Sequence, residues 1–266
     1  MTMMFRPDSH LLEVSDALVD PRVGIIANVT DVPRHPGGPD FFTFHAQACN
    51  TAAFVGSRNF GSTAGSSLRR ERAIAKALGE AIERYCSAIY DPRDFLLHTH
   101  RKAPKGAIDP ELFALYSNEQ YLTAAFPYRP FTRDSPVRWT TAIDLTSQQL
   151  AYVPAAMVYV PYYFSEDETP FIQPMSTGLA CHTTYERAVI SGICEVIERD
   201  SFSLAWLQGF SPPRINLHTL SDECRAIIQT FERTGRNVVL LNITRDTHIP
   251  TILAVQNSDH FEIRWR

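Results

Sequence analysis

Six charged residues share one pattern, a glutamate, two other residues, a second glutamate and an arginine, which occurs twice in the sequence. They are Glu80, Glu83 and Arg84 in the first copy, and Glu195, Glu198 and Arg199 in the second. In a helix, residues at i, i+3 and i+4 project from one face, so each copy presents two carboxylates beside one guanidinium. Carboxylate oxygens suit Mg²⁺, which usually also holds substrate phosphates, and guanidinium groups suit phosphate oxygens. We therefore predict that the four glutamates bind metal and that the two arginines contact a phosphorylated ligand.

The elements that must position these charges are two predicted helices. Residues 72–84 (RAIAKALGEAIER) return as residues 187–199 (RAVISGICEVIER), and apolar residues recur in both at steps of three and four. A single copy has a simpler interpretation, a surface ion pair between Glu80 and Arg84 worth about 0.2–0.5 kcal/mol. Because the pattern occurs twice on otherwise apolar helices, we favour an arrangement in which the two helices face each other and their charged side chains line one shared site. This arrangement predicts that crowding of like charges raises the pKa of at least one of the four glutamates.

The rest of the chain predicts an α/β fold with two pseudosymmetric halves, each with mixed or antiparallel strands and one of these helices. Runs of small residues, 56–67 and 175–180, come just before the two helices. Such a run can let a phosphate approach backbone N–H groups, although a plain connecting loop is also compatible with it. The sequence further predicts strands at 23–29, 41–49, 137–144, 150–153, 156–163, 238–244 and 250–256, and helices at 111–116 and 222–234.

Composition limits the function classes. The chain has 266 residues and a net charge of −4, which argues against non-specific nucleic-acid binding. Its five cysteines form no CxxC pair, so we expect a reducing cytoplasmic environment without a disulfide framework. No signal peptide is evident, and no apolar run is long enough to predict a membrane span.

The doubled motif resembles the YcaO family. The resemblance rests on residues 79–86 (GEAIERYC), 176–180 (STGLA) and 195–200 (EVIERD). It implies an ATP-binding domain at residues 22–266 that is incomplete at its C-terminal end, preceded by an N-terminal extension, residues 1–21. In this family ATP and Mg²⁺ bind between the two motif helices. The usual activity is ATP-dependent cyclodehydration of Cys, Ser or Thr in a ribosomally made precursor peptide, which gives thiazolines or oxazolines.

The resemblance also implies partners and alternatives. It implies the precursor peptide as substrate, a partner protein that binds the leader peptide, and a homodimer, with no nucleic acid or membrane involved. Relatives form thioamides instead of rings. A catalytically weak scaffold that binds a peptide or a partner is a further alternative. The catalytic residues and the identity of the peptide stay open at this point.

The sequence departs from the family pattern at several positions. Lys76 stands where the family commonly has a serine, and Ser66 stands near the place of a lysine in the glycine-containing loop. Before the second helix, Ala180, Thr183 and Arg187 replace a Ser, an Asn and a Glu that contact nucleotide, and Thr183 keeps hydrogen-bonding capacity. We therefore expect Ser66 and Thr183 near the nucleotide. A glutamate–glutamine motif in the family's C-terminal third has no counterpart, which indicates a shortened chain or a reduced homologue.

Overall fold

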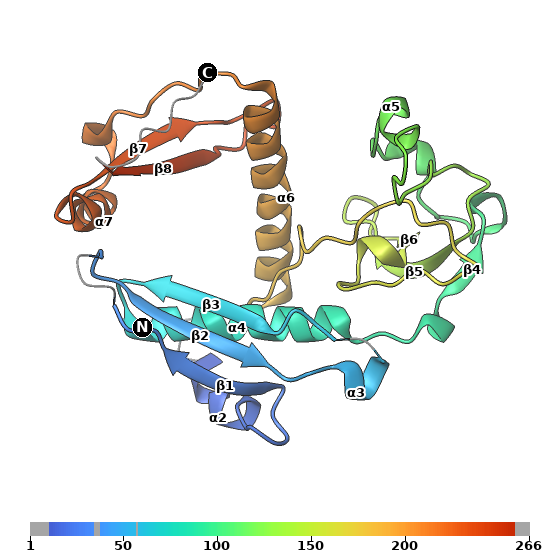
Figure 1. The fold of residues 1–266 in the computed structure, drawn as a ribbon, viewed down its shortest axis with the longest axis horizontal. Coiled ribbons are helices and arrows are strands. Elements are labelled where there is room, and N and C mark those ends of the chain that lie inside the picture. Colours follow the sequence, from blue (N-terminus) through green and yellow to red (C-terminus); the bar gives the residue numbers. More distant parts are fainter. Residues whose placement is uncertain (1–10, 35–37, 57, 259–266) are drawn as a thin grey trace.

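The computed structural model describes residues 11–34, 38–56 and 58–258, and its first group of elements is a small sheet with one long helix. Strands β1 (Ile26–Asp31), β2 (Phe42–Ala48) and β3 (Ser62–Ser67) pair antiparallel in the order β1-β2-β3. The helix α4 (Arg70–Ala88) runs along this sheet (Figure 1). The short helices α2 (Ser15–Leu18) and α3 (Ala52–Val55) precede β1 and β3.

The second group lies beyond the C-terminal end of α4. It contains strands β4 (Leu96–His98), β5 (Val137–Ile143) and β6 (Leu150–Pro154), paired antiparallel in that order, and the short helix α5 (Asn118–Tyr121). Its core includes Trp139 and Phe171, both fully buried. Glu168, also buried, accepts hydrogen bonds from the hydroxyl groups of Tyr162 (2.6 Å) and Ser165 (3.0 Å). This carboxylate therefore organises the loops of this group.

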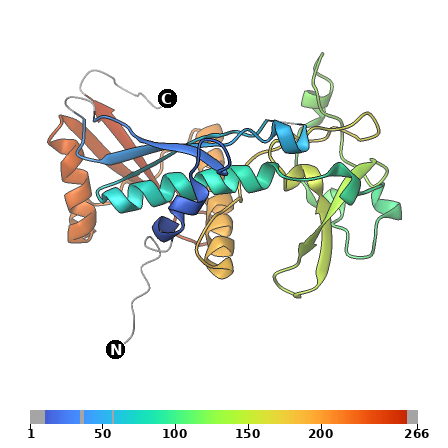
Figure 2. The ribbon, with the colours of Figure 1, turned by 90° about the horizontal axis from the view of Figure 1, so that it is seen from below.

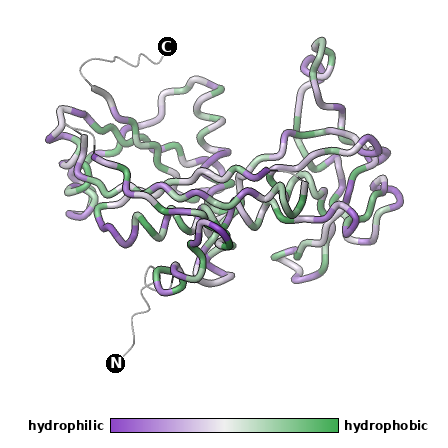
Figure 3. Tube along the Cα trace, turned by 60° about the horizontal axis from the view of Figure 1, so that its bottom comes forward, coloured by the Kyte–Doolittle hydropathy of each residue, from purple (hydrophilic) through white to green (hydrophobic). Residues whose placement is uncertain are grey.

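The third group surrounds the helix α6 (Tyr185–Gln208), which crosses the direction of α4 steeply (Figures 1 and 2). The N-terminal end of α6 lies near α4, and its C-terminal half lies beside the hairpin of β7 (Arg236–Asn242) and β8 (Ile252–Ser258). The helix α7 (Asp222–Glu232) precedes β7. Hydrophobic residues are spread along the whole described chain (Figure 3), and no described helix is long and apolar enough to cross a bilayer.

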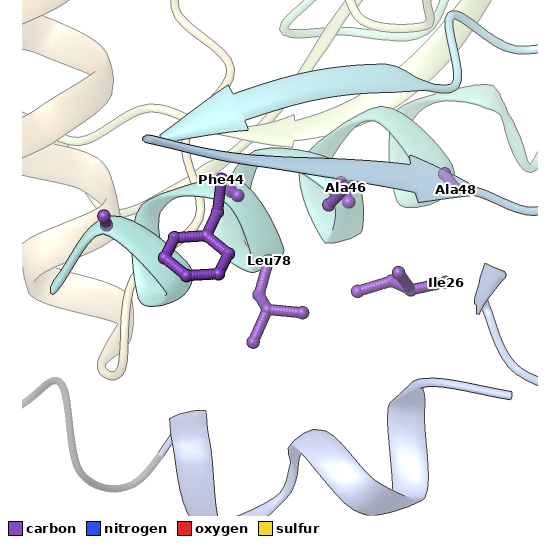
Figure 4. Close-up of a cluster of buried hydrophobic side chains, with 8 residues drawn as sticks. Ile26, Phe44, Ala46, Ala48 and Leu78 are labelled. Atoms are coloured by element: carbon purple, nitrogen blue, oxygen red, sulfur yellow. The ribbon is translucent and has the colours of Figure 1, made fainter. Parts of the chain in front are cut away.

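Close packing of β3 on α4 explains the second half of the first run of small residues, since Ser62–Ser67 of the run 56–67 form a strand and not part of a loop. Gly65 in β3 lies so near α4 that an added Cβ would come within 2.5 Å of the Ala77 nitrogen. The hydroxyl group of Thr63 donates to the carbonyl oxygen of Ala77 at 3.0 Å. Ile26, Phe44 and Leu78 complete a core between β2, α4 and the N-terminal helical turns (Figure 4). The small residues of β3 therefore allow the strand and α4 to pack closely against each other.

Several other sequence predictions can be compared with the structure. The hairpin at 137–144 and 150–153 is confirmed, as are the helix beginning at Asp222 and the last two strands. The strand predicted at 156–163 is wrong. That stretch begins with the 3-10 turn Ala155–Met157 and is apolar because Val160 and Tyr162 are buried. The helix predicted at 111–116 is only the 3-10 turn Pro110–Leu112.

The two motif helices are present, but the described elements do not show two matching halves. A three-stranded sheet precedes and covers α4, whereas an irregular segment precedes α6 and its hairpin follows it. The pseudosymmetric arrangement therefore stays a prediction, and so do the domain bounds 22–266 and 1–21. Leu11 and Leu12 in the N-terminal part pack against the core of the first group.

Two glycines near α4 give a matched test of this packing. Gly65→Ala places a methyl group against the α4 backbone and is expected to lower the free energy of unfolding by about 1–3 kcal/mol. Gly79→Ala meets only Cys181 Sγ at 4.0 Å and is expected to raise it by about 0.5–1 kcal/mol, because alanine favours a helix. Urea denaturation measures both. Equal effects of the two substitutions would contradict the proposed tight contact.

Candidate functional site

Both arginines of the repeated motif contact glutamates of their own copy. On α4, Arg84 lies 3.4 Å from Glu80 and 3.7 Å from Glu83, measured between guanidinium nitrogens and carboxylate oxygens. On α6, the guanidinium group of Arg199 lies 3.2 Å from a carboxylate oxygen of Glu195. The i,i+4 ion pair that the spacing alone predicts is thus present in both helices. The contact of Arg84 and Arg199 with a phosphorylated ligand stays a prediction.

The irregular segment 176–183 lies between the two motif helices, near one glutamate of each. The backbone N–H of Gly178 donates to Glu195 Oε2 at 2.9 Å. Glu83 lies close enough to Cys181 for the Cys181 backbone to lower the pKa of Glu83 and for the Glu83 charge to raise the pKa of the Cys181 thiol. A Cβ on Gly192 in α6 would come within 2.5 Å of the Gly178 carbonyl oxygen, so this glycine allows the segment to approach the helix. The two copies of the motif are therefore brought together through this segment.

Glu83 is the motif glutamate whose pKa is displaced from its ordinary value. Burial is the largest cause and raises the pKa, while Arg84 lowers it and the negative charges of Glu195 and Glu80 raise it further. The direction agrees with the expectation from the sequence, but removal from water outweighs the repulsion between carboxylates. Burial also raises the pKa of the Cys181 thiol, and the nearby Glu83 adds to that rise.

A cavity of about 710 Å³ lies along α4 and includes part of this site. It is lined by Leu11, Val14, Leu18, Ala64, Arg72, Ala75, Lys76, Gly79, Glu80, Ile82, Glu83, Cys181, His182 and Thr183. Among the predicted residues, the structure thus brings Glu80, Glu83 and Thr183 to one cavity. Its volume is in the range of cofactor and substrate sites.

The other predicted residues lie outside the lining of this cavity. Glu195 lies close enough to Glu83 to affect its pKa, whereas the Glu198 side chain is 63% exposed. Ser66 lines a neighbouring hollow, and its carbonyl oxygen accepts a hydrogen bond from Lys76 Nζ at 3.1 Å. Two positions that the sequence analysis singled out, Ser66 and Lys76, therefore lie side by side, and Lys76 brings an ammonium group to Ser66.

The donor set fits a metal ion that arrives with phosphates better than a metal held by protein alone. Within the part of the chain that the structure describes, no three His, Cys, Asp or Glu side chains converge as a metal site. Mg²⁺ commonly takes one or two carboxylates and completes its coordination with water and substrate phosphates. Glu80 and Glu83 in one cavity meet that requirement. A site made by all four glutamates stays a prediction.

Sequence reasoning missed part of the cavity lining. Arg72 and His182 received no role, and Lys76 was noticed only as a departure from the family pattern. A signal for the two cations was present, since Arg72, Lys76 and Glu80 follow one another at i,i+4 spacing. No local pattern in the sequence could show that Leu11 and Leu18 reach this place.

Comparison with known proteins decides the family. The model of the family described as YcaO cyclodehydratase, ATP- and Mg²⁺-binding, matches residues 64–263. This chain belongs to the YcaO family. An uncharacterized protein of Methanothermobacter thermautotrophicus is 30% identical over 255 residues, which cover 94% of this chain and 60% of that protein. An uncharacterized protein in the tfuA 3′ region of Rhizobium leguminosarum bv. trifolii is 30% identical over 138 residues, covering 49% of this chain and 32% of that protein.

Solved structures share the YcaO fold. A heterocyclase in complex with substrate and cofactor gives a TM-score of 0.78 at 22% identity, covering 95% of this chain and 36% of that chain. YcaO from Methanopyrus kandleri, bound with AMPPCP and Mg²⁺, gives 0.61 at 21% identity, covering 90% of this chain and 54% of that chain. The present chain thus spans about a third to three fifths of the length of these relatives.

The raised pKa of Glu83 predicts a pH-dependent effect of Glu83→Gln on metal-free stability. A carboxylate whose pKa is raised in the folded protein destabilises the fold as pH rises above its unfolded pKa, and glutamine removes that penalty. The Tm of the variant minus the Tm of wild type should therefore be larger at pH 8 than at pH 4. Differential scanning fluorimetry with EDTA measures it, and Glu166→Gln in an exposed loop controls for loss of one charge. A relative Tm that falls from pH 4 to pH 8 would identify Glu83 as mainly an ion-pair partner of Arg84.

The close approach of Gly192 to segment 176–183 predicts a local effect of Gly192→Ala. The methyl group would displace the Gly178 carbonyl, so we expect Cys181 to open to solvent and to react with iodoacetamide about tenfold faster. Peptide mapping by mass spectrometry follows Cys181 separately from the other cysteines. Ser191→Ala, at an exposed neighbouring position, should leave the rate unchanged. The same rate in Gly192→Ala would contradict this packing.

Proposed function

We propose that this chain provides the nucleotide-binding part of an ATP- and Mg²⁺-dependent enzyme that modifies peptide backbone amides. The favoured reaction is cyclodehydration of Cys, Ser or Thr to a thiazoline or oxazoline in a ribosomally made peptide. The observation that carries the proposal is the cavity in which Glu80 and Glu83 of the first motif meet the segment that Glu195 of the second motif holds. Membership of a family described as ATP- and Mg²⁺-binding supports it.

The residues present suit phosphoryl transfer, which asks a protein mainly for positioning and charge neutralisation. In the proposed reaction a peptide thiol or hydroxyl loses its proton and adds to the preceding amide carbon. The former amide oxygen takes the γ-phosphoryl group of ATP, and ADP is released. This oxygen then leaves as phosphate while the former amide nitrogen loses its proton and forms the C=N bond of the ring. Glu80 and Glu83 would hold Mg²⁺ together with the phosphates, and the metal would neutralise charge that develops on them. Thr183 would donate a hydrogen bond, and Arg84 and Arg199 would keep the carboxylates oriented.

The nucleophile in this scheme is the peptide's own side chain, so the protein has no need of a catalytic nucleophile. Cys181 is half-buried and its thiol pKa is raised, which makes it a poor nucleophile and agrees with a structural role. We further propose a cytoplasmic location, a homodimer, and a partner protein that binds the leader of the precursor peptide. A microcin synthetase structure, the McbBCD complex with pro-MccB17 bound, supports the last point by likeness of fold at 15% identity and a TM-score of 0.56.

Nucleotide binding is the first test of this function. Isothermal titration calorimetry should show that AMPPCP binds the full chain more tightly with Mg²⁺ than without it. Glu80→Gln should weaken the Mg²⁺-dependent binding about tenfold, since a charge-assisted contact is lost. Glu195→Gln should weaken it by a similar factor, and Glu166→Gln should leave it unchanged. Equal affinity with and without Mg²⁺ would contradict the metal role of the motif.

Peptide modification is the second part of the same test. Co-expression with a candidate precursor peptide, followed by mass spectrometry, should show loss of one water for each ring formed. Replacement of an oxygen by sulfur would identify the thioamide-forming alternative. Nucleotide binding without any change in peptide mass, in the presence of the partner protein, would favour the scaffold alternative.

A further inference from the structure

A second pocket lies between the C-terminal half of α6 and the β7–β8 hairpin (Figure 1). It has a volume of about 230 Å³ and shares no lining residue with the cavity along α4. The helix contributes the rings of Phe202 and Trp206, and the hairpin contributes aliphatic residues of one face, such as the cross-strand pair Val239 and Val255. Most of this pocket is therefore apolar, and it is separate from the site of the repeated motif.

Arg214 is the one charged side chain that lines this pocket in the part of the chain that the structure describes. Its backbone is fixed by an antiparallel bridge to Leu241 of β7, and its side chain is exposed. Across residues 11–34, 38–56 and 58–258, no carboxylate forms an ion pair with its guanidinium group. A guanidinium group without an anionic partner beside apolar rings favours a ligand that carries a carboxylate next to an apolar group.

A second guanidinium group adjoins one wall of the same pocket. The guanidinium carbon of Arg245 lies 4.0 Å from the ring centroid of Phe210, and this ring lines the pocket. Arg245 donates to Gln208 Oε1 at 3.3 Å, while its Nε is buried and has no hydrogen-bond partner among the described residues. Two positive charges near an apolar pocket raise the local concentration of anionic ligands and disfavour cationic ones.

The size of the pocket and its aromatic rim indicate a polypeptide as the ligand. A cavity of about 150 Å³ can hold benzene, so this pocket has room for one aromatic or large aliphatic side chain. Phe202 and Trp206 stack with their ring centroids 5.9 Å apart, and their side chains are 37% and 58% exposed. These rings extend the apolar surface beyond the pocket itself. A free small acid would fill the pocket and leave this rim uncovered, whereas a peptide chain would cover both.

We propose that this pocket binds a peptide segment in which an aromatic or large aliphatic residue stands beside an acidic residue. The apolar side chain enters between α6 and the hairpin, the peptide backbone crosses the rings of Phe202 and Trp206, and the carboxylate pairs with Arg214. The inference does not rest on the proposed nucleotide chemistry. It adds to the chain a docking site for a partner polypeptide on a face apart from the cavity along α4.

Three matched peptides test the two parts of this contact: acetyl-Gly-Phe-Glu-Gly-amide, a Phe-Gln analogue without the charge, and an Ala-Glu analogue without the ring. Fluorescence of Trp206 in the full chain follows binding, and Trp206→Phe identifies its signal. The Phe-Glu peptide should bind about fivefold more tightly than the Phe-Gln analogue, because only the former makes a charge-assisted contact. The Ala-Glu analogue should bind about tenfold more weakly than the Phe-Glu peptide, because it buries no ring.

Substitutions assign the preference for the acidic peptide to one side chain. Arg214→Met should abolish this preference and leave the affinity for the Phe-Gln analogue unchanged, since the methionine keeps an apolar stem. Arg214→Lys keeps the positive charge and should retain most of the preference. Arg129→Met removes an exposed cation of the second group and should change neither affinity.

Several outcomes would overturn the inference. Wild type could give no saturable response to the Phe-Glu peptide at millimolar concentration, or it could bind the Phe-Glu and Phe-Gln peptides equally. A preference that survives in Arg214→Met would contradict the role of this arginine. If light scattering shows a dimer that Trp206→Ser dissociates, the face is an interface between two copies of the chain and not a peptide site. None of these results bears on nucleotide binding, which calorimetry with AMPPCP measures separately.

Discussion

One hydrogen bond from a backbone N–H group to a motif glutamate fixes the segment that carries part of the candidate site. Gly178 donates to Glu195 of α6, and Glu83 of α4 lies near Cys181 of the same segment, so the segment lies between two helices that are distant in the sequence. A carboxylate acceptor makes such a bond stronger than a bond between neutral groups. His182 and Thr183 of this segment line the cavity. Loss of the Glu195 carboxylate would therefore alter the cavity even without a direct effect on a ligand.

The same carboxylates are those that a metal would use, and in this structure their charges are already satisfied. Arg84 and Arg199 contact them within their own helices, and the backbone N–H of Gly178 donates to Glu195. Binding of Mg²⁺ with phosphates must exchange some of these contacts for new ones, so the net gain is smaller than the sum of the new bonds. Glu80, on the cavity wall and paired with Arg84 at 3.4 Å, can make that exchange without releasing the segment.

Sequence periodicity was sufficient to predict α4, α6 and the ion pairs within them, because which residues at i, i+3 and i+4 share a face depends only on helix geometry. It failed where structure depends on distant contacts. The run at 62–67 lacks the bulky residues typical of strands and becomes β3 through pairing with β2 and close contact with α4. Residues 156–163 have a strand-like composition, but they form no strand, and Val160 and Tyr162 are buried without partners in a sheet. For the same reason the sequence indicated Glu80 and Glu83 but not Leu11 and Leu18, which line the same cavity.

The absence of a side chain at Gly65 has a consequence for the charged residues of α4 that line the cavity. Because Gly65 is set against Ala73 and Ala77, close contact requires this small-residue face of the helix to turn toward the strand. A slip of one residue would turn the helix by about 100°, and this turn would carry Glu80 and Lys76 away from the cavity. Packing against β3 thus fixes the angular position of the charged α4 side chains that line the cavity, although the strand contributes no charged group of its own.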